Sequence, residues 1–276
     1  MGRLRPYTLP NGMKAYGLSR TDTDLVYQEI FEEDVYRRHR VTIRDGDCIF
    51  DVGANTGLFI VFLNQICRRL SVYAFEPIPA ICQILRRNVE LHDKLGVNVF
   101  EIGLSREPET ATFTYYPRLS CASTMYPDDL QEEDQRAREY ILAQFRELPN
   151  RPLRWLLCAT PLSAQRLIAA VVRKHYSKRQ QVTCTLRTIS ELIKEHEIKR
   201  VDLLKLDAER SELDVLAGIE PHDWAKIRQA VIEVHEGEAS RQAVHRQFVE
   251  RGFHVETDQN PHFPNIFILY AVRPEG

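Results

Sequence analysis

Residues 51–57, with the sequence DVGANTG, form a glycine-bearing turn that directly follows a short apolar run. Glycine lets the backbone approach a ligand closely, and a helix that begins after the turn offers unpaired N–H groups at its amino end. A dinucleotide fingerprint requires G-x-G-x-x-G, and this turn has Asn55 between its glycines, so NAD is disfavoured. The alternative is a turn that only joins a strand to a helix. We predict that the turn binds a cofactor through Asp51, Gly53, Asn55 and Gly57.

Glu76 ends the next apolar strand and lies 25 positions after Asp51. An acidic side chain at that place can accept hydrogen bonds from both hydroxyl groups of a ribose. Pro77 and Pro79 fix the path of the chain after the strand. The alternative is a solvated glutamate at a strand end. Together with the glycine turn, Glu76 indicates a cofactor that contains a ribose.

The composition is that of a folded globular protein, with 276 residues, 43% hydrophobic and 28% charged. A net charge of -2 gives no sign of the broad basic face that nucleic acid binding requires. The sequence has neither a signal peptide nor an apolar stretch of membrane-spanning length. Its six cysteines lie far apart and indicate buried thiols in a reducing compartment. We therefore expect a cytoplasmic protein that binds neither nucleic acid nor membranes.

The elements that must position these residues alternate along the chain. Short apolar strands are predicted at 48–52, 72–76, 97–102, 201–206 and 230–234, with helices between them. This alternation is typical of an α/β fold with a doubly wound parallel sheet, whose ligands bind at the carboxyl ends of the strands. We expect the last two strands, 253–255 and 266–270, to form a hairpin.

Two segments fall outside this alternation. Residues 1–46 are predicted to form an N-terminal hairpin around Asn11-Gly12 and a capping helix at 24–38. Residues 47–276 are predicted to form the core, interrupted by a helical insertion at 128–179.

Three motifs resemble the FkbM family of S-adenosylmethionine-dependent methyltransferases: residues 51–57, residues 74–79 (AFEPIP), and residues 202–218 (DLLKLDAERSELDVLAG). The resemblance extends from about residue 47 to residue 270. The N-terminal segment, the STMYP string at 123–127 and the insertion are most similar to the O-methyltransferase domains of polyketide and mixed peptide assembly lines. The family usually has a glycine after the second acid of its D-V-E-G motif. This chain has Arg210 there, a departure that the assembly-line branch often shares.

The resemblance implies a Rossmann-like class I methyltransferase with a mostly parallel seven-stranded sheet and a helical lid formed by the insertion. It implies that S-adenosylmethionine is the cofactor, with its sulfonium methyl group directed toward Asp207. The remaining contacts implied are those of the glycine turn, of Glu76 with the ribose, and of Gly103 and Leu104 with the adenine, and Pro77 also belongs to the predicted cofactor site. The implied acceptor is a hydroxyl or enol oxygen of a polyketide-like molecule tethered to an acyl carrier protein.

Methyl transfer from sulfur to oxygen is an in-line displacement, which requires aligned reactants and a base that removes the acceptor's proton. His235 directly follows the strand at 230–234, which places it at the same sheet edge as Asp207 and Glu209. An imidazole titrates near neutral pH, at about 6.5, and a carboxylate can orient it. We predict that His235, Asp207 and Glu209 form the catalytic group, the alternative for His235 being a surface residue at a strand end.

A divalent cation is a competing interpretation of the same residues. Asp207, Glu209, Glu233 and His235 together offer oxygen and nitrogen ligands. Because the sequence has no dense ligand motif, we assign no metal.

Two other functions also remain open. The acceptor could instead be a free small metabolite or a sugar hydroxyl. The chain could also be a non-catalytic nucleotide-type binding module, since a fold does not determine a function. Such a module would not need a base beside Asp207 and Glu209.

Overall fold

The computed structural model describes residues 5–92, 94–117, 120, 123–126, 178–235, 237–260 and 265–274. Residues 128–177 of the predicted insertion lie outside the described residues, so its helices and its predicted role as a lid stay predictions.

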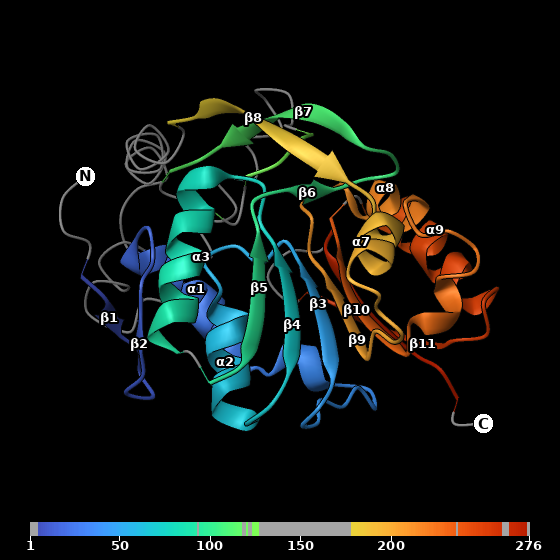
Figure 1. The fold of residues 1–276 in the computed structure, drawn as a ribbon, viewed down its shortest axis with the longest axis horizontal. Helices are drawn as coiled ribbons and strands as arrows, with labels where there is room; N and C mark the ends of the chain where they lie inside the picture. Colours follow the sequence, from blue (N-terminus) through green and yellow to red (C-terminus); the bar gives the residue numbers. More distant parts are fainter. Residues whose placement is uncertain are drawn as a thin grey trace, which may run out of the picture.

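The central sheet has seven strands in the order β11-β12-β10-β9-β3-β4-β5 (Figure 1). Strands β5, β4, β3, β9 and β10 are parallel, whereas β12 runs antiparallel to both β10 and β11. The doubly wound, mostly parallel sheet predicted from the sequence is confirmed, and so is the antiparallel pairing of the last two strands. The strands are β3 (Cys48–Val52), β4 (Ser71–Phe75), β5 (Gly96–Phe100), β9 (Leu203–Leu206), β10 (Gln229–Val234), β11 (His254–Gln259) and β12 (Phe267–Val272).

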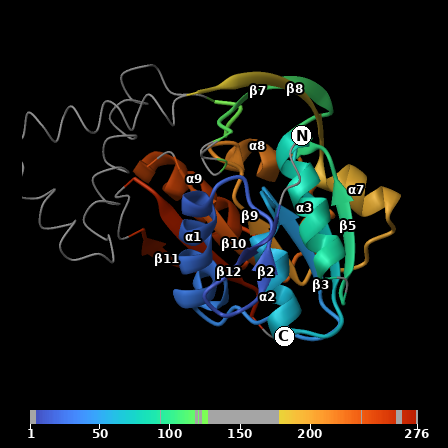
Figure 2. The ribbon, with the colours of Figure 1, turned by 90° about the vertical axis from the view of Figure 1, so that its left-hand side faces the viewer.

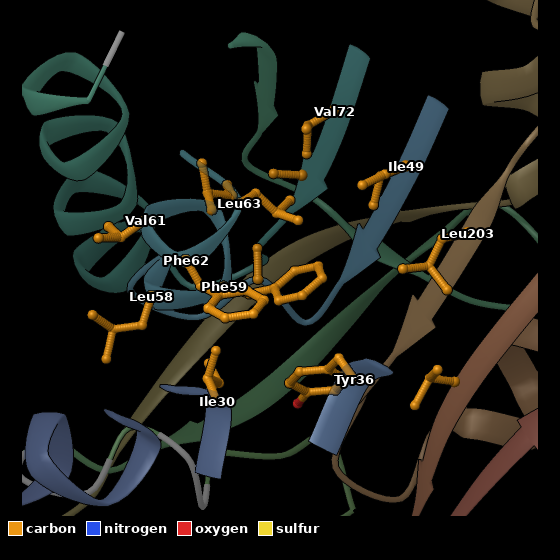
Figure 3. Close-up of a cluster of buried hydrophobic side chains, with 14 of the residues drawn as sticks. Ile30, Tyr36, Ile49, Leu58, Phe59, Val61, Phe62, Leu63, Val72 and Leu203 are labelled. Atoms are coloured by element: carbon orange, nitrogen blue, oxygen red, sulfur yellow. The ribbon is translucent and has the colours of Figure 1, made fainter. Parts of the chain in front are cut away.

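Helices cover both faces of this sheet (Figures 1 and 2). One face carries α1 (Arg20–Tyr27), α2 (Leu58–Ile66) and α3 (Pro79–Leu91), and the other carries α7 (Ile189–Glu195), α8 (Glu212–Ala217) and α9 (Gly237–Val249). Each face has its own apolar cluster. Residues 58–63 of α2 are all buried, because this helix is covered by the N-terminal segment as well as by the sheet (Figure 3). Burial of these side chains fixes the turn before α2 in place.

The N-terminal hairpin is confirmed: β1 (Tyr7–Thr8) pairs with β2 (Lys14–Ala15), and Gly12 in the turn has φ 84°. The predicted helix at 24–38 differs from the structure. Helix α1 begins earlier, because the Ser19 side chain caps it by accepting from the N–H of Asp22. A π-helix η1 (Gln28–Glu32) and a 3-10 helix η2 (Val35–Arg37) follow, separated by Asp34 at φ 51°.

A second sheet, which the sequence analysis did not predict, lies beyond the carboxyl end of β5 (Figure 1). Its strands are β6 (Gly103–Leu104), β8 (Gln180–Arg187) and β7 (Glu109–Tyr115), in the order β6-β8-β7. Strand β7 pairs over its whole length with β8, although many residues separate the two strands in the chain. Their polar, threonine-containing sequences lack the apolar runs that mark the central strands.

Candidate active site

A cleft of about 620 Å³, open solvent included, lies at the carboxyl ends of β3, β4 and β9, where a doubly wound sheet binds its ligands. Phe113 of the second sheet, Ser120 and Ser123 contribute to its wall. Of the residues predicted from the sequence, the cleft is lined by Gly53, Asn55, Glu76, Pro77, Gly103, Leu104, Asp207 and Glu209.

The glycine turn brings the backbone close to the loop after β9. Gly53 has φ 74°, and a Cβ atom there would lie 1.7 Å from the carbonyl oxygen of Asp207. Only glycine fits this approach. Asn55 adopts φ 48°, a left-handed conformation that asparagine tolerates better than most residues. Its backbone N–H donates to Glu76 Oε2 at 3.1 Å, which joins the turn to the end of β4.

Glu76 presents a buried carboxylate to this cleft. Its Oε1 accepts from the N–H of Ile78 at 2.9 Å. Burial raises the pKa of Glu76 to about 7, although the hydrogen bonds from the Ile78 and Asn55 N–H groups oppose the increase. Each oxygen retains a lone pair that can accept from a ligand hydroxyl, so the two acceptor oxygens fit the hydroxyl groups of a ribose.

Two predicted cofactor residues lie outside the cleft. Asp51 is fully buried, and its Oδ1 pairs with Lys205 Nζ at 2.9 Å. Lys205 also donates to the carbonyl oxygen of Gly53 at 3.1 Å, so the ion pair between Lys205 and Asp51 holds the turn against β9. Gly57 begins α2 at φ 83°, where a Cβ atom would lie 2.5 Å from Leu85 Cδ1. The structure therefore gives Asp51 and Gly57 positions that support the turn, and their predicted contacts with the cofactor stay predictions.

The predicted catalytic residues come together at the neighbouring strand ends. Nε2 of His235 lies 3.6 Å from Glu209 Oε2 and 3.9 Å from Asp207 Oδ1. Glu233 Oε1 is 3.7 Å from the same nitrogen. The other ring nitrogen, Nδ1, donates to Glu212 Oε1 at 2.9 Å. We call His235 and these four carboxylates the His235 cluster.

The cluster changes the acid-base behaviour expected of His235. Burial alone would lower its pKa, but Glu209, Glu212 and Glu233 outweigh burial and raise the pKa well above the usual value. The usual imidazole value predicts a titration near neutral pH, and the position of His235 at a strand end does not reveal how many carboxylates lie nearby. His235 is also buried, which corrects the alternative of a surface residue.

Sequence reasoning missed three residues around this site: Lys205, Glu212 and Glu29. Lys205 could have been found from the sequence, because it lies inside an otherwise apolar strand. A buried amine in a sheet requires a charged or polar partner. Glu29 lies on η1. Its burial and, to a smaller extent, the negative charge of Asp207 raise its pKa to about 7. Its Oε1 is 3.4 Å from the hydroxyl of Tyr36. No sequence pattern links η1 to the end of β9.

The structure also brings together three of the side chains that the sequence offers as metal ligands. Ligand atoms of Asp207, Glu233 and His235 all lie within 4.8 Å of one another among the described residues. These donors fit a divalent cation as well as a proton relay, so metal removal belongs in every functional test of this site.

No described helix is long and apolar enough to cross a membrane.

Comparisons with known proteins relate this chain to methyltransferases. A family model described as the methyltransferase FkbM domain matches residues 51–259. The chain is 32% identical over 255 residues to the 31-O-demethyl-FK506 methyltransferase FkbM of Streptomyces tacrolimicus, covering 92% of this chain and 91% of that protein. It is 36% identical over 275 residues to the AMB antimetabolite synthetase AmbE of Pseudomonas aeruginosa, covering 96% of this chain but only 12% of that protein. It is 27% identical over 267 residues to methyltransferase sdnD of Sordaria araneosa, covering 94% of this chain and 92% of that protein.

Proposed function

Because the chain belongs to the FkbM family of methyltransferases, with S-adenosylmethionine as cofactor, we propose that it methylates an oxygen atom. The acceptor is a hydroxyl or enol group of a polyketide-like molecule carried by an acyl carrier protein. One observation carries the proposal: Asp207 and Glu209 line the cleft and also contact His235, which is not itself a lining residue. The proposed base, His235, therefore lies directly behind two residues that line the cleft.

Different residues of the cleft bind different parts of the cofactor. Glu76 accepts from the ribose hydroxyls, and Gly53 allows the turn to pack closely against the loop after β9 beside it. Pro77, Gly103 and Leu104 form the wall for the adenine. When bound, the cofactor supplies an electrophilic methyl group on a positively charged sulfur.

His235 then accepts the acceptor's proton at Nε2, while Glu212 holds Nδ1 and so fixes the plane of the ring. Asp207 and Glu209 stabilise the imidazolium that results. The remaining requirement is alignment of the acceptor oxygen with the methyl carbon.

Two relatives support this acceptor class. The name of the Streptomyces protein refers to a 31-O-demethyl substrate, and the Pseudomonas protein is a synthetase much longer than this chain. A buried histidine held by a buried glutamate also supports catalysis over a purely binding role, since a ribose site does not require it.

The test is incubation of the protein with S-adenosylmethionine and a β-hydroxyacyl carrier protein, followed by mass spectrometry of the acyl chain. The same acyl group as a free acid and as a short thioester provides matched acceptors. We expect one added methyl group on oxygen, transferred fastest to the carrier-bound form. Equal rates on the free acid would contradict tethering, and methylation at carbon would contradict O-methylation.

A further inference from the structure

Ser211 lines the cleft with a hydroxyl group that the protein itself leaves unpaired. The residue follows the loop after β9 and is only 4% exposed. Among the described residues, none hydrogen bonds to its buried Oγ. A buried hydroxyl without a partner destabilises the folded state, and such groups are rare in native proteins. A ligand that occupies the cleft could supply the missing partner.

Helix capping does not explain the position of this hydroxyl. Ser211 is the N-cap residue of α8, where a serine side chain usually accepts from a backbone N–H of the first turn. In α8, all of whose residues are described, the Ser211 side chain makes no such bond. Its φ of -99° and ψ of 10° also differ from the extended conformation that a capping serine adopts. The side chain is therefore not used to begin the helix.

The geometry of α8 indicates which end of the cleft Ser211 faces. Residues four positions apart lie on the same face of a helix, so Ser211 shares a face with Val215, whose N–H donates to its carbonyl oxygen at 2.9 Å. Val215 belongs to the same apolar cluster as Leu104 of β6. Glu212, which binds His235, points about 100° away around the helix. Ser211 therefore faces the Leu104 end of the cleft.

Close packing fixes α8 beside β6. A Cβ atom on Gly218, directly after α8, would lie 2.2 Å from the carbonyl oxygen of Ser105, directly after β6. Because only glycine permits this approach, the last turn of α8 is held against the end of β6. Helix α8 has six residues, so its position at Gly218 also determines where Ser211 lies at its start.

Resting on the proposed function, which places the adenine against Gly103 and Leu104, we propose that Ser211 binds the cofactor through a hydrogen bond from its hydroxyl group to a nitrogen of the adenine edge. Adenine has an amino group that donates and ring nitrogens that accept, and a hydroxyl group can do both. The serine side chain has three staggered rotamers, so its oxygen reaches the base without movement of the backbone. Ser211 thus adds a polar contact to an otherwise apolar adenine wall.

This contact gives the hydroxyl group opposite effects in the free and the bound protein. In the free protein it is buried and unpaired, so its removal does not weaken the fold. In the complex it is paired with the base, so its removal weakens binding. A serine that only supports the fold behaves in the reverse way, because its removal lowers stability and leaves the affinity for the cofactor unchanged.

The experiment compares Ser211→Ala with Ser190→Ala. Ser190 is also 4% exposed, but it is not a lining residue of the cleft, and its Oγ accepts from the N–H of Glu220 at 2.8 Å. Calorimetry of S-adenosylhomocysteine measures affinity, and urea unfolding without ligand measures stability. We expect Ser211→Ala to weaken binding by about three- to tenfold with an unfolding midpoint equal to or above that of the unaltered protein. Ser190→Ala should lower the midpoint and leave the affinity unchanged.

Analogues of S-adenosylhomocysteine identify the nitrogen that Ser211 contacts. In each analogue, the amino group is replaced by hydrogen or one ring nitrogen is replaced by C–H. We expect one analogue to bind the unaltered protein less tightly than S-adenosylhomocysteine, by about the same three- to tenfold. In Ser211→Ala this analogue and S-adenosylhomocysteine should bind almost equally, since both sides of the contact are then tested in one cycle.

Unchanged affinity in Ser211→Ala would overturn the inference, as would a midpoint lowered as in Ser190→Ala or a loss of affinity that is equal for every analogue. Methylation of the carrier-bound hydroxyl together with normal binding by Ser211→Ala would leave the proposed function intact. Absence of any methyl transfer to oxygen alongside the expected binding data would remove the proposed function alone.

Discussion

Glu76 couples cofactor binding to pH, because burial raises its pKa to about 7 and ribose hydroxyls donate to its ionised form. We predict that affinity for S-adenosylhomocysteine rises with pH up to about 7 and levels off above it. Glu76→Gln should weaken binding by about 1–3 kcal/mol and flatten this profile, because it removes a charged acceptor. Calorimetry across pH measures both effects. Glu101→Gln, at an exposed neighbour, is the control, and an unchanged profile in Glu76→Gln would exclude the ribose role.

His235 determines the rate of the proposed transfer rather than cofactor affinity. A positioned base contributes about 100- to 10,000-fold, so His235→Ala should lower the transfer rate by at least about 100-fold while S-adenosylhomocysteine still binds. His254→Ala provides the comparison. A nearly normal rate in His235→Ala would mean that alignment alone accounts for catalysis.

The raised pKa of His235 also predicts how the rate of transfer depends on pH. The neutral ring is the active form, so kcat/KM for S-adenosylmethionine should rise with pH. Because kcat/KM reports the free enzyme, the midpoint should lie above the value of about 6.5 typical of histidine. A midpoint at or below that value would contradict the effect of the carboxylates.

At the next scale, strands β3 and β9 are joined by an ion pair in register, since Asp51 lies opposite Lys205. Removing one member of a buried pair costs about 3–5 kcal/mol, because the other charge remains without a partner. Lys205→Met should therefore destabilise the protein by this amount in urea unfolding. The double variant Asp51→Leu with Lys205→Met should recover much of the loss. Lys199→Met, at an exposed position, should have little effect.

The loop after β9 holds two successive residues in the left-handed region, Glu209 at φ 46° and Arg210 at φ 82°. Arg210 occupies the position where the family usually has glycine, and the dihedral explains that preference. The variants Arg210→Gly and Arg210→Ala both lose the guanidinium, so their difference reports backbone strain. We predict that the glycine variant is more stable by about 1 kcal/mol in denaturant unfolding. Equal stabilities would indicate that the loop relaxes.

For the molecule as a whole, ligand binding and folding are linked because the cleft is built from β3, β4, β9 and the second sheet together. S-adenosylmethionine at about 100 times its Kd should stabilise the folded state by about 2.7 kcal/mol. A thermal melt should show this as a raised Tm. NAD should give no shift, because Asn55 replaces the glycine of a dinucleotide turn; a shift with NAD alone would refute the cofactor assignment.

The sequence by itself determined the features that depend on local order along the chain. Alternating strands and helices predict a doubly wound sheet, and carboxyl ends of parallel strands meet at one edge. That rule is sufficient to place the glycine turn, Glu76, Asp207, Glu209 and His235 near one another. The Asn-Gly hairpin was also predictable, because its turn chemistry is local.

Only the tertiary structure decided which of these residues face the cleft and how they titrate. Asp51 precedes the turn in sequence, but the register with β9 directs it to Lys205. Glu29 and Glu212 reach the same region from η1 and α8, and their charges act through space on groups far away in the chain. A pKa depends on burial and on every nearby charge. The strongly raised pKa of His235 is therefore a property of the assembled site, which no pattern along the sequence contains.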